Sequence, residues 1–124
     1  DYVVIMTPLT PQTRNLIGAR ELALMKPTAV LINAARGGIV DEQALYDALK
    51  NGVIWAAGLD VFEREPVPTD HPLLSLPNVT ALPHIGSASI RTRTRMAELA
   101  AENLLDALAG RVPRCLVNRE VVGE

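Results

Sequence analysis

Four short apolar runs constrain the fold of this chain more than any other feature of its sequence. They cover residues 2–6, 28–33, 53–61 and 78–82. Apolar runs without alternating polar residues are typical of strands in parallel sheets that are covered on both faces. Helix-forming stretches at residues 19–26 and 42–51 separate the first three runs. This order predicts a mostly parallel α/β sheet whose strands are joined by right-handed crossovers.

Local signals mark where the helices begin and end. Pro27 stops the first helix, because a proline cannot continue it. Asp41 is a suitable N-cap for the second helix, and Gly52 stands at the C′ position that favours glycine. A long third helix, capped by Ser87 or Ser89, carries an apolar stripe near the helical period.

The chain begins inside an apolar run, at Asp1 and Tyr2, with no methionine or leader before it. Domains rarely start inside a central strand, so we expect this chain to be the C-terminal portion of a longer protein. Residues 1–110 are expected to form the second half of a doubly wound, Rossmann-like α/β sheet with a long C-terminal helix. Residues 111–124 are expected to form a tail.

The composition is that of an ordinary soluble globular protein. Apolar residues make up 48% of the chain, charged residues 21%, and the net charge is −2, which disfavours a nucleic acid partner. No apolar run approaches the roughly 18–20 residues that a spanning helix needs, so no membrane partner is expected. Arg91, Arg93 and Arg95 lack interleaved aromatic residues, and they predict a solvated helix face rather than a nucleic acid patch.

Cysteine and histidine usage narrows the chemistry. Cys115 is the only cysteine, which excludes an intrachain disulfide and a cysteine-based zinc site. It also fits a reducing compartment, so we expect a cytoplasmic protein. The two histidines, His71 and His84, are too few for a histidine metal site, and no metal is expected. His71 lies in a proline-rich turn, whose shape we expect it to fix.

His84 is the strongest candidate for chemistry. It follows the fourth apolar run, and ligand sites in open parallel sheets lie just beyond the carboxyl ends of strands. The acidic loop after the third run offers Glu63 and Glu65 as partners. We prefer Glu65, because Pro66 after it favours extended geometry. Such a Glu–His pair holds one imidazole tautomer and stabilises the protonated ring.

Arg36 and Asp60 also follow predicted strands. Arg36 precedes Gly37 and Gly38, which permit positive φ and the close approach of a ligand. Its guanidinium could bind a carboxylate through two parallel hydrogen bonds. Asp60 is too costly to bury unpaired, so we expect it to accept hydrogen bonds from backbone or ligand amides.

Three segments of the chain resemble the D-isomer-specific 2-hydroxyacid dehydrogenases. They occur in the order and with the spacing that this family shows. They are LINAARGGIVD at residues 31–41, GLDVFEREP at 58–66 and NVTALPHIGSA at 78–88. The resemblance covers nearly all of residues 1–118, and the stretch at 68–74 and the arginine-rich helix look most like the glyoxylate/hydroxypyruvate reductase branch. The related formate dehydrogenases carry glutamine where Glu65 stands, which disfavours that branch.

The resemblance implies a role for each candidate residue. His84 falls on the proton donor and acceptor, Glu65 on the carboxylate that orients it and favours its protonated form, and Arg36 on the residue that binds the substrate carboxylate and carbonyl. Asp60 matches an acid near the nicotinamide carboxamide. The cofactor-binding positions implied for NAD or NADP are Thr7, Thr13, Ala34, Ala35, Arg36, Asp60, His84, Gly86 and Ser87.

The implied activity is hydride transfer between NAD(P)H and a small 2-oxo or 2-hydroxy acid of the glyoxylate or hydroxypyruvate type, by a homodimer at full length. Residues 1–110 would then be the nicotinamide half of a dinucleotide-binding domain, and residues 111–124 a tail that returns towards a substrate domain. The glycine-rich phosphate turn of this family and the residue that selects NAD or NADP do not occur within the 124 residues.

Two alternatives remain open at this point. One is a non-catalytic, dinucleotide-sensing protein similar to the corepressors that resemble this family. The other is a standalone module made of these 124 residues. We expect the chain alone to be inactive and to self-associate, because residues 2–6 would expose an apolar edge and face.

Overall fold

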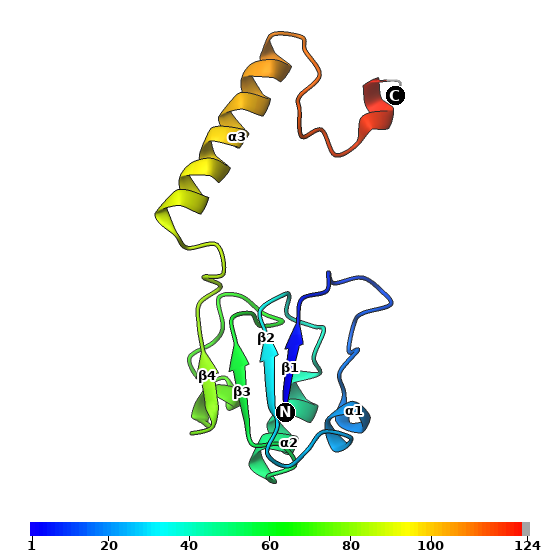
Figure 1. The fold of residues 1–124 in the computed structure, drawn as a ribbon, viewed down its shortest axis with the longest axis vertical. Coiled ribbons are helices and arrows are strands. Elements are labelled where there is room, and N and C mark those ends of the chain that lie inside the picture. Colours follow the sequence, from blue (N-terminus) through cyan, green and yellow to red (C-terminus); the bar gives the residue numbers. More distant parts are fainter. Residues whose placement is uncertain (123–124) are drawn as a thin grey trace. The chain divides into compact units, whose positions relative to one another are not determined.

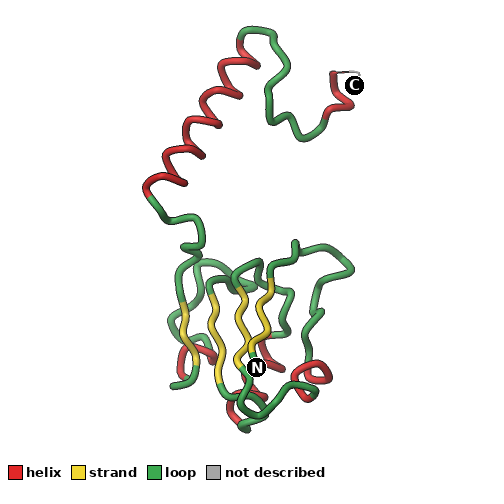
Figure 2. Tube along the Cα trace, viewed as in Figure 1, coloured by secondary structure: helices red, strands yellow, loops and turns green. Residues whose placement is uncertain are grey.

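The computed structural model describes residues 1–122, which fall into a unit of residues 1–86 and a second unit that starts at Ser87. In the first unit, four strands form one sheet in the order β1-β2-β3-β4 (Figures 1 and 2). The strands are β1 (Tyr2–Ile5), β2 (Val30–Asn33), β3 (Ala56–Leu59) and β4 (Val79–Ala81). All three neighbouring pairs are parallel, which confirms the predicted fold class.

The core of this unit lies on one face of the sheet. Leu31 pairs in register with Ala57 on β3, and both are almost fully buried. Leu22 and Leu45 from the two helices α1 (Ala19–Ala23) and α2 (Glu42–Lys50) belong to the same buried cluster. On the opposite face and edge, β1 leaves Tyr2 71% and Val4 54% exposed. Within residues 1–86, the cover expected on both faces is therefore present on one face only, and the exposure predicted for β1 is confirmed.

The second helix has the predicted ends, whereas the first is shorter than expected. Asp41 Oδ1 accepts a hydrogen bond from the Ala44 N–H at 2.9 Å, and Gly52 has a φ of 68°, as a C′ glycine requires. The first helix ends at residue 23 rather than 26. Its last turn tightens, because the N–H groups of Leu24 and Met25 donate to carbonyls three residues back.

The third strand is also shorter than the apolar run that predicts it. The run covers residues 53–61, but β3 begins at residue 56, because the Val53 N–H donates to the carbonyl of Ala48 at the end of α2 (2.8 Å). The backbone hydrogen bonds continue past β3, where the Asp60 N–H donates to the Asn33 carbonyl at 3.0 Å. β2 and β4 likewise lack one or two terminal residues of their predicted runs.

The second unit contains the long helix α3 (Ile90–Leu108) and a short 3-10 helix, η2 (Arg119–Val122). Of the two predicted caps, Ser89 is the one used, and its Oγ accepts from the Thr92 N–H at 3.1 Å. Gly110 has a φ of 69° just beyond the helix. No described residue of α3 is buried, and Arg91, Arg93 and Arg95 are exposed.

Candidate active site

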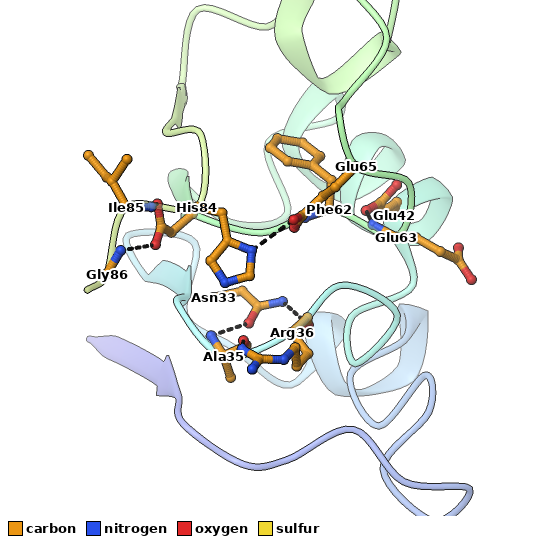
Figure 3. Close-up of polar contacts among 11 residues, drawn as sticks. Asn33, Ala35, Arg36, Glu42, Phe62, Glu63, Glu65, His84, Ile85 and Gly86 are labelled. Carbon is orange, nitrogen blue, oxygen red and sulfur yellow. Dashed lines mark hydrogen bonds and ion pairs between the residues drawn. The ribbon is translucent and has the colours of Figure 1, made fainter. Parts of the chain in front are cut away.

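Three loops bring the candidate residues to the carboxyl end of the sheet. Arg36 follows β2, Glu65 lies in the acidic loop after β3, and His84 follows β4. Since the three strands are parallel neighbours, their loops leave the sheet at the same edge. Figure 3 draws Arg36, Glu65 and His84 in one region of the first unit.

His84 and Glu65 form the predicted pair. The distance between His84 Nδ1 and Glu65 Oε2 is 2.7 Å, and the two side chains are 44% and 37% exposed. Glu63, the other candidate, instead binds Arg14 Nη1 at 2.8 Å. The pair leaves the Nε2 atom of His84 without a hydrogen-bond partner among residues 1–122, and a ligand could therefore use it.

The Glu65 carboxylate is held from two sides. The bond from the His84 imidazole lowers the pKa of Glu65 below its ordinary value of 4.5, and the bond from the Phe62 N–H to Oε1 (3.0 Å) lowers it further. The charge of Arg36 contributes a smaller lowering, which places the guanidinium within electrostatic range of the carboxylate. Because an ionised Glu65 can only accept, His84 Nδ1 is the donor of the pair.

Asp60 fixes the loop that carries His84. Asp60 is only 8% exposed, and its carboxylate accepts from the N–H groups of Ile85 and Gly86, each at 2.8 Å. The His84 N–H donates to the Asp60 carbonyl at 2.9 Å. These bonds hold His84 at a φ of 55°, which is uncommon for a residue other than glycine. The predicted need of Asp60 for amide donors is confirmed, and the backbone supplies them.

Arg36 lies in a loop that the buried Asn33 organises. Asn33 Oδ1 accepts from the Ala35 N–H at 3.1 Å, while its Nδ2 donates to the Arg36 carbonyl at 3.0 Å. Arg36 Nη1 donates to the carbonyl of Ala35 at 2.7 Å. Its other guanidinium donors have no hydrogen-bond partner within the described part of the chain, so they are available to an anion.

The two glycines after Arg36 serve different purposes. Gly38 has a φ of 79°, as its predicted conformational role requires. Gly37 was expected to admit a ligand, but the structure contradicts this expectation. A Cβ on Gly37 would lie 1.9 Å from the carbonyl oxygen of Phe62. The close neighbour of Gly37 is therefore the protein's own acidic loop, and the glycine lets the loops of Arg36 and Glu65 pack together.

The predicted cofactor positions are only partly brought together. Thr7, Ala34, Ala35 and Arg36 line one open hollow of about 610 Å³ at the carboxyl ends of β1 and β2. Thr13 lies outside this lining, and its hydroxyl donates to the Pro8 carbonyl at 2.7 Å, where it shapes the loop.

The remaining positions differ in what they can offer a cofactor. The amide of Gly86 is occupied by Asp60, and both oxygens of Asp60 already accept backbone hydrogen bonds. Ser87 begins the second unit.

Two groups at the site were not recognised in the sequence as functional candidates. Asn33 organises the Arg36 loop, and a polar residue at the end of an apolar run was a signal for it. Arg14 joins the loop after β1 to the acidic loop through Glu63, and no local pattern indicates that contact.

Two kinds of feature are absent from the described residues. Within residues 1–122, no group of three or more His, Cys, Asp or Glu side chains could hold a metal ion. None of the helices in that same range is long and apolar enough to cross a membrane.

The fold and the strand-end site together define a nucleotide-binding type of α/β domain. Residues 1–86 match the family model described as "D-isomer specific 2-hydroxyacid dehydrogenase, NAD binding domain". The chain belongs to the D-isomer specific 2-hydroxyacid dehydrogenase family, as its three motifs predicted.

Individual relatives agree with this assignment. The chain is 58% identical over 123 residues to glyoxylate/hydroxypyruvate reductase B of Citrobacter koseri, which covers 99% of this chain and 38% of that protein. It is 59% identical over 122 residues to the reductase of the same name from Enterobacter agglomerans, across 98% of this chain and 38% of that protein. The chain therefore spans about two fifths of the length of these relatives.

Solved structures show the same likeness. The NADPH-dependent glyoxylate/hydroxypyruvate reductase of Sinorhizobium meliloti, in complex with NADP and malonate, matches with a TM-score of 0.79 and 48% identity, over 86% of this chain and 33% of that one. The D-lactate dehydrogenase of Lactobacillus jensenii with NAD+ matches with a TM-score of 0.84 and 34% identity, over 94% of this chain and 39% of that one.

Proposed function

We propose that this chain supplies the catalytic loops of an oxidoreductase that transfers a hydride between NAD(P)H and a small 2-oxo or 2-hydroxy acid. The observation that carries the proposal is the 2.7 Å contact between Glu65 and His84 at the strand ends, with Arg36 within electrostatic range. The family assignment and the identity to glyoxylate/hydroxypyruvate reductases favour substrates of the glyoxylate or hydroxypyruvate type.

The residues at the carboxyl end of β1 and β2 suit the nicotinamide half of the cofactor. The open hollow of about 610 Å³ has a size that fits part of a dinucleotide, and its lining combines the small side chains of Thr7, Ala34 and Ala35 with larger apolar ones and Arg36. Thr7, Ala34 and Ala35 would hold the cofactor there, with Thr13 shaping the neighbouring loop. When bound, a reduced nicotinamide supplies the hydride.

The chain's own residues supply the remaining chemistry. The free donors of Arg36 hold the carboxylate and the carbonyl oxygen of the 2-oxo acid. His84 donates the proton on Nε2 to that oxygen as the carbonyl carbon is reduced, and Glu65 compensates the charge of the imidazolium before transfer. In the oxidation direction, neutral His84 takes the hydroxyl proton at the same atom. Asp60 keeps His84 in place through the backbone of its loop.

The domain organisation, the cellular compartment and the oligomeric state belong to the same proposal. We place residues 1–110 in the nicotinamide half of the dinucleotide-binding domain and residues 111–124 in a tail that returns towards a substrate domain. We further propose a cytoplasmic homodimer. Light scattering on the whole protein tests the dimer, and a monomer at working concentration would contradict it.

Turnover of glyoxylate and hydroxypyruvate with NADH and with NADPH, by the whole protein that contains this chain, tests the activity. We expect oxidation of the reduced nicotinamide that depends on the oxo acid. Dinucleotide binding without turnover of either acid would instead support the corepressor-like alternative.

A further inference from the structure

We propose that Glu42 and His71 are positioning residues that hold the Glu65 carboxylate against His84. The proposal rests on the proposed function, because it assigns a second Glu–His pair to the support of the acid–base pair. The Glu42–His71 pair contacts the acidic loop through the Glu63 N–H and the Phe62 ring. Neither residue belongs to the pair proposed to exchange the proton.

The backbone of the acidic loop helps to position Glu65. Glu65 Oε1 accepts from the Phe62 N–H at 3.0 Å, so the position of that peptide helps to decide where the carboxylate lies. The next peptide donates to the second pair, because the Glu63 N–H bonds to Glu42 Oε1 at 2.6 Å (Figure 3). Glu42 is the first residue of α2, where the helix dipole stabilises a carboxylate.

His71 contacts Phe62 of the same loop and also binds Glu42. Its Nε2 lies 3.0 Å from Glu42 Oε2, and the two side chains are only 18% and 20% exposed. The ring of the buried Phe62 meets the imidazole edge to face, with the centroids 5.5 Å apart. The residues before Glu65 are thus held by a backbone bond to Glu42 and by a side-chain contact with His71.

Both ring nitrogens of His71 have hydrogen-bond partners. The Leu73 N–H donates to His71 Nδ1 at 3.3 Å, so Nδ1 acts as an acceptor. Nε2 therefore carries the proton and donates it to Glu42. Both ring nitrogens are occupied in one neutral tautomer, which suits a fixed support and leaves no nitrogen for a substrate.

Two substitutions separate this role from a merely structural one. Glu42→Gln keeps one oxygen acceptor, which can serve either the Glu63 N–H or the His71 ring, but not both. His71→Asn keeps an oxygen that can accept the Leu73 N–H and cap the turn, but it removes the ring and cannot reach Glu42. The matched control is Gln43→Ala, which removes an exposed 3.2 Å bond to Asp47 on the same helix and touches no part of the acidic loop.

The whole protein is assayed with glyoxylate and reduced nicotinamide across pH, and its imidazole nitrogens are observed by NMR. We expect Glu42→Gln and His71→Asn each to lower kcat by about tenfold with little change in KM, because a displaced acid group loses alignment. The pH–rate profile changes as well, because a displaced Glu65 no longer accepts the His84 Nδ1–H in the wild-type geometry. The His84 signals shift in both variants and stay unchanged in Gln43→Ala.

The outcomes separate the two proposals. If the wild type turns over but both variants keep its kcat, pH profile and His84 signals, the positioning role is wrong and the proposed function stands. A fall in stability alone, without those changes, has the same meaning. If the wild type turns over neither oxo acid, the proposed function fails. The His84 signals of the variants then decide the positioning role, which an unshifted spectrum overturns.

Discussion

The chain contains two Glu–His pairs that share their chemistry and differ in their surroundings. Glu65 and His84 are 2.7 Å apart and 37% and 44% exposed, whereas Glu42 and His71 are 3.0 Å apart and 20% and 18% exposed. His71 uses both ring nitrogens, while within residues 1–122 His84 uses only Nδ1. A free nitrogen at an open strand end, rather than the Glu–His pair itself, therefore distinguishes a proton donor from a structural histidine.

The backbone conformations of the two histidines also differ. His71 has an ordinary extended conformation, with a φ of −61°, and caps the short 3-10 helix η1 (Pro72–Ser75). The role predicted for it, to fix the turn, is thereby confirmed. His84 has a φ of 55° and stays there because Asp60 binds three successive backbone N–H groups. An uncommon conformation that is held so firmly is typical of functional sites.

Replacing the imidazole that has the free nitrogen, by His84→Ala in the whole protein, should have the most severe consequence. General acid catalysis contributes about 10²–10⁴-fold, so kcat/KM for the 2-oxo acid should fall by at least about 10²-fold. Steady-state kinetics measures it, with far-ultraviolet circular dichroism to show that the variant folds. A folded variant that loses less than about tenfold would remove His84 from the role of acid.

Arg36→Lys tests whether a guanidinium binds the substrate anion next to the Glu65–His84 pair. A lysine cannot offer two parallel donors, and one lost bond to a charged group is worth about 1.5–3 kcal/mol. We therefore expect kcat/KM to fall by roughly 10- to 100-fold, mainly through a higher KM. Arg20→Lys, on an exposed pair with Glu21, is the control and should change neither constant. An unchanged KM in Arg36→Lys would contradict the assignment.

Gly37→Ala tests how closely the Arg36 loop packs on the acidic loop, which contacts both Glu–His pairs. Because a Cβ would meet the Phe62 carbonyl at 1.9 Å, the loops must move apart. We expect a loss of about 1–3 kcal/mol in the free energy of unfolding, measured by urea denaturation. Gly18→Ala is the control, since its nearest neighbour would be a side-chain atom of Glu21 at 3.6 Å. Equal stability of the two variants would count against the close packing.

The smallest effect concerns the pH dependence of stability. The pKa of Glu65 is lower in the folded chain than its ordinary value of 4.5, chiefly because of the bond from His84. Such a group stabilises the fold above its unfolded pKa, and the stabilisation is lost as the pH falls through the folded pKa. We expect the wild type to lose more stability on acidification below about pH 4.5 than Glu65→Gln does.

The pair is partly exposed, so this difference is small. Thermal unfolding midpoints of both proteins, taken at several pH values on each side of that window, measure it. Parallel curves would show that the contact between Glu65 and His84 does not contribute to stability.

Local signals in the sequence are enough to predict the helices, the strands and the strand ends that the candidate residues follow. Apolar runs, Pro27, Asp41 and Gly52 act through propensity and capping within a few residues, and such signals are readable locally. They placed Arg36 and His84 beyond strand ends. The proline after Glu65 also favoured that residue over Glu63, and the structure confirms the contact.

Contacts between groups that are distant in sequence depend on how the elements pack. Glu42 and His71 are 29 residues apart in sequence, and Asp60 lies 25 and 26 residues from the two amides that its side chain binds. The closeness of Gly37 to Phe62 depends in the same way on the register of neighbouring strands. No local pattern encodes these contacts, because they arise only when parallel strands align their loops at one edge of the sheet.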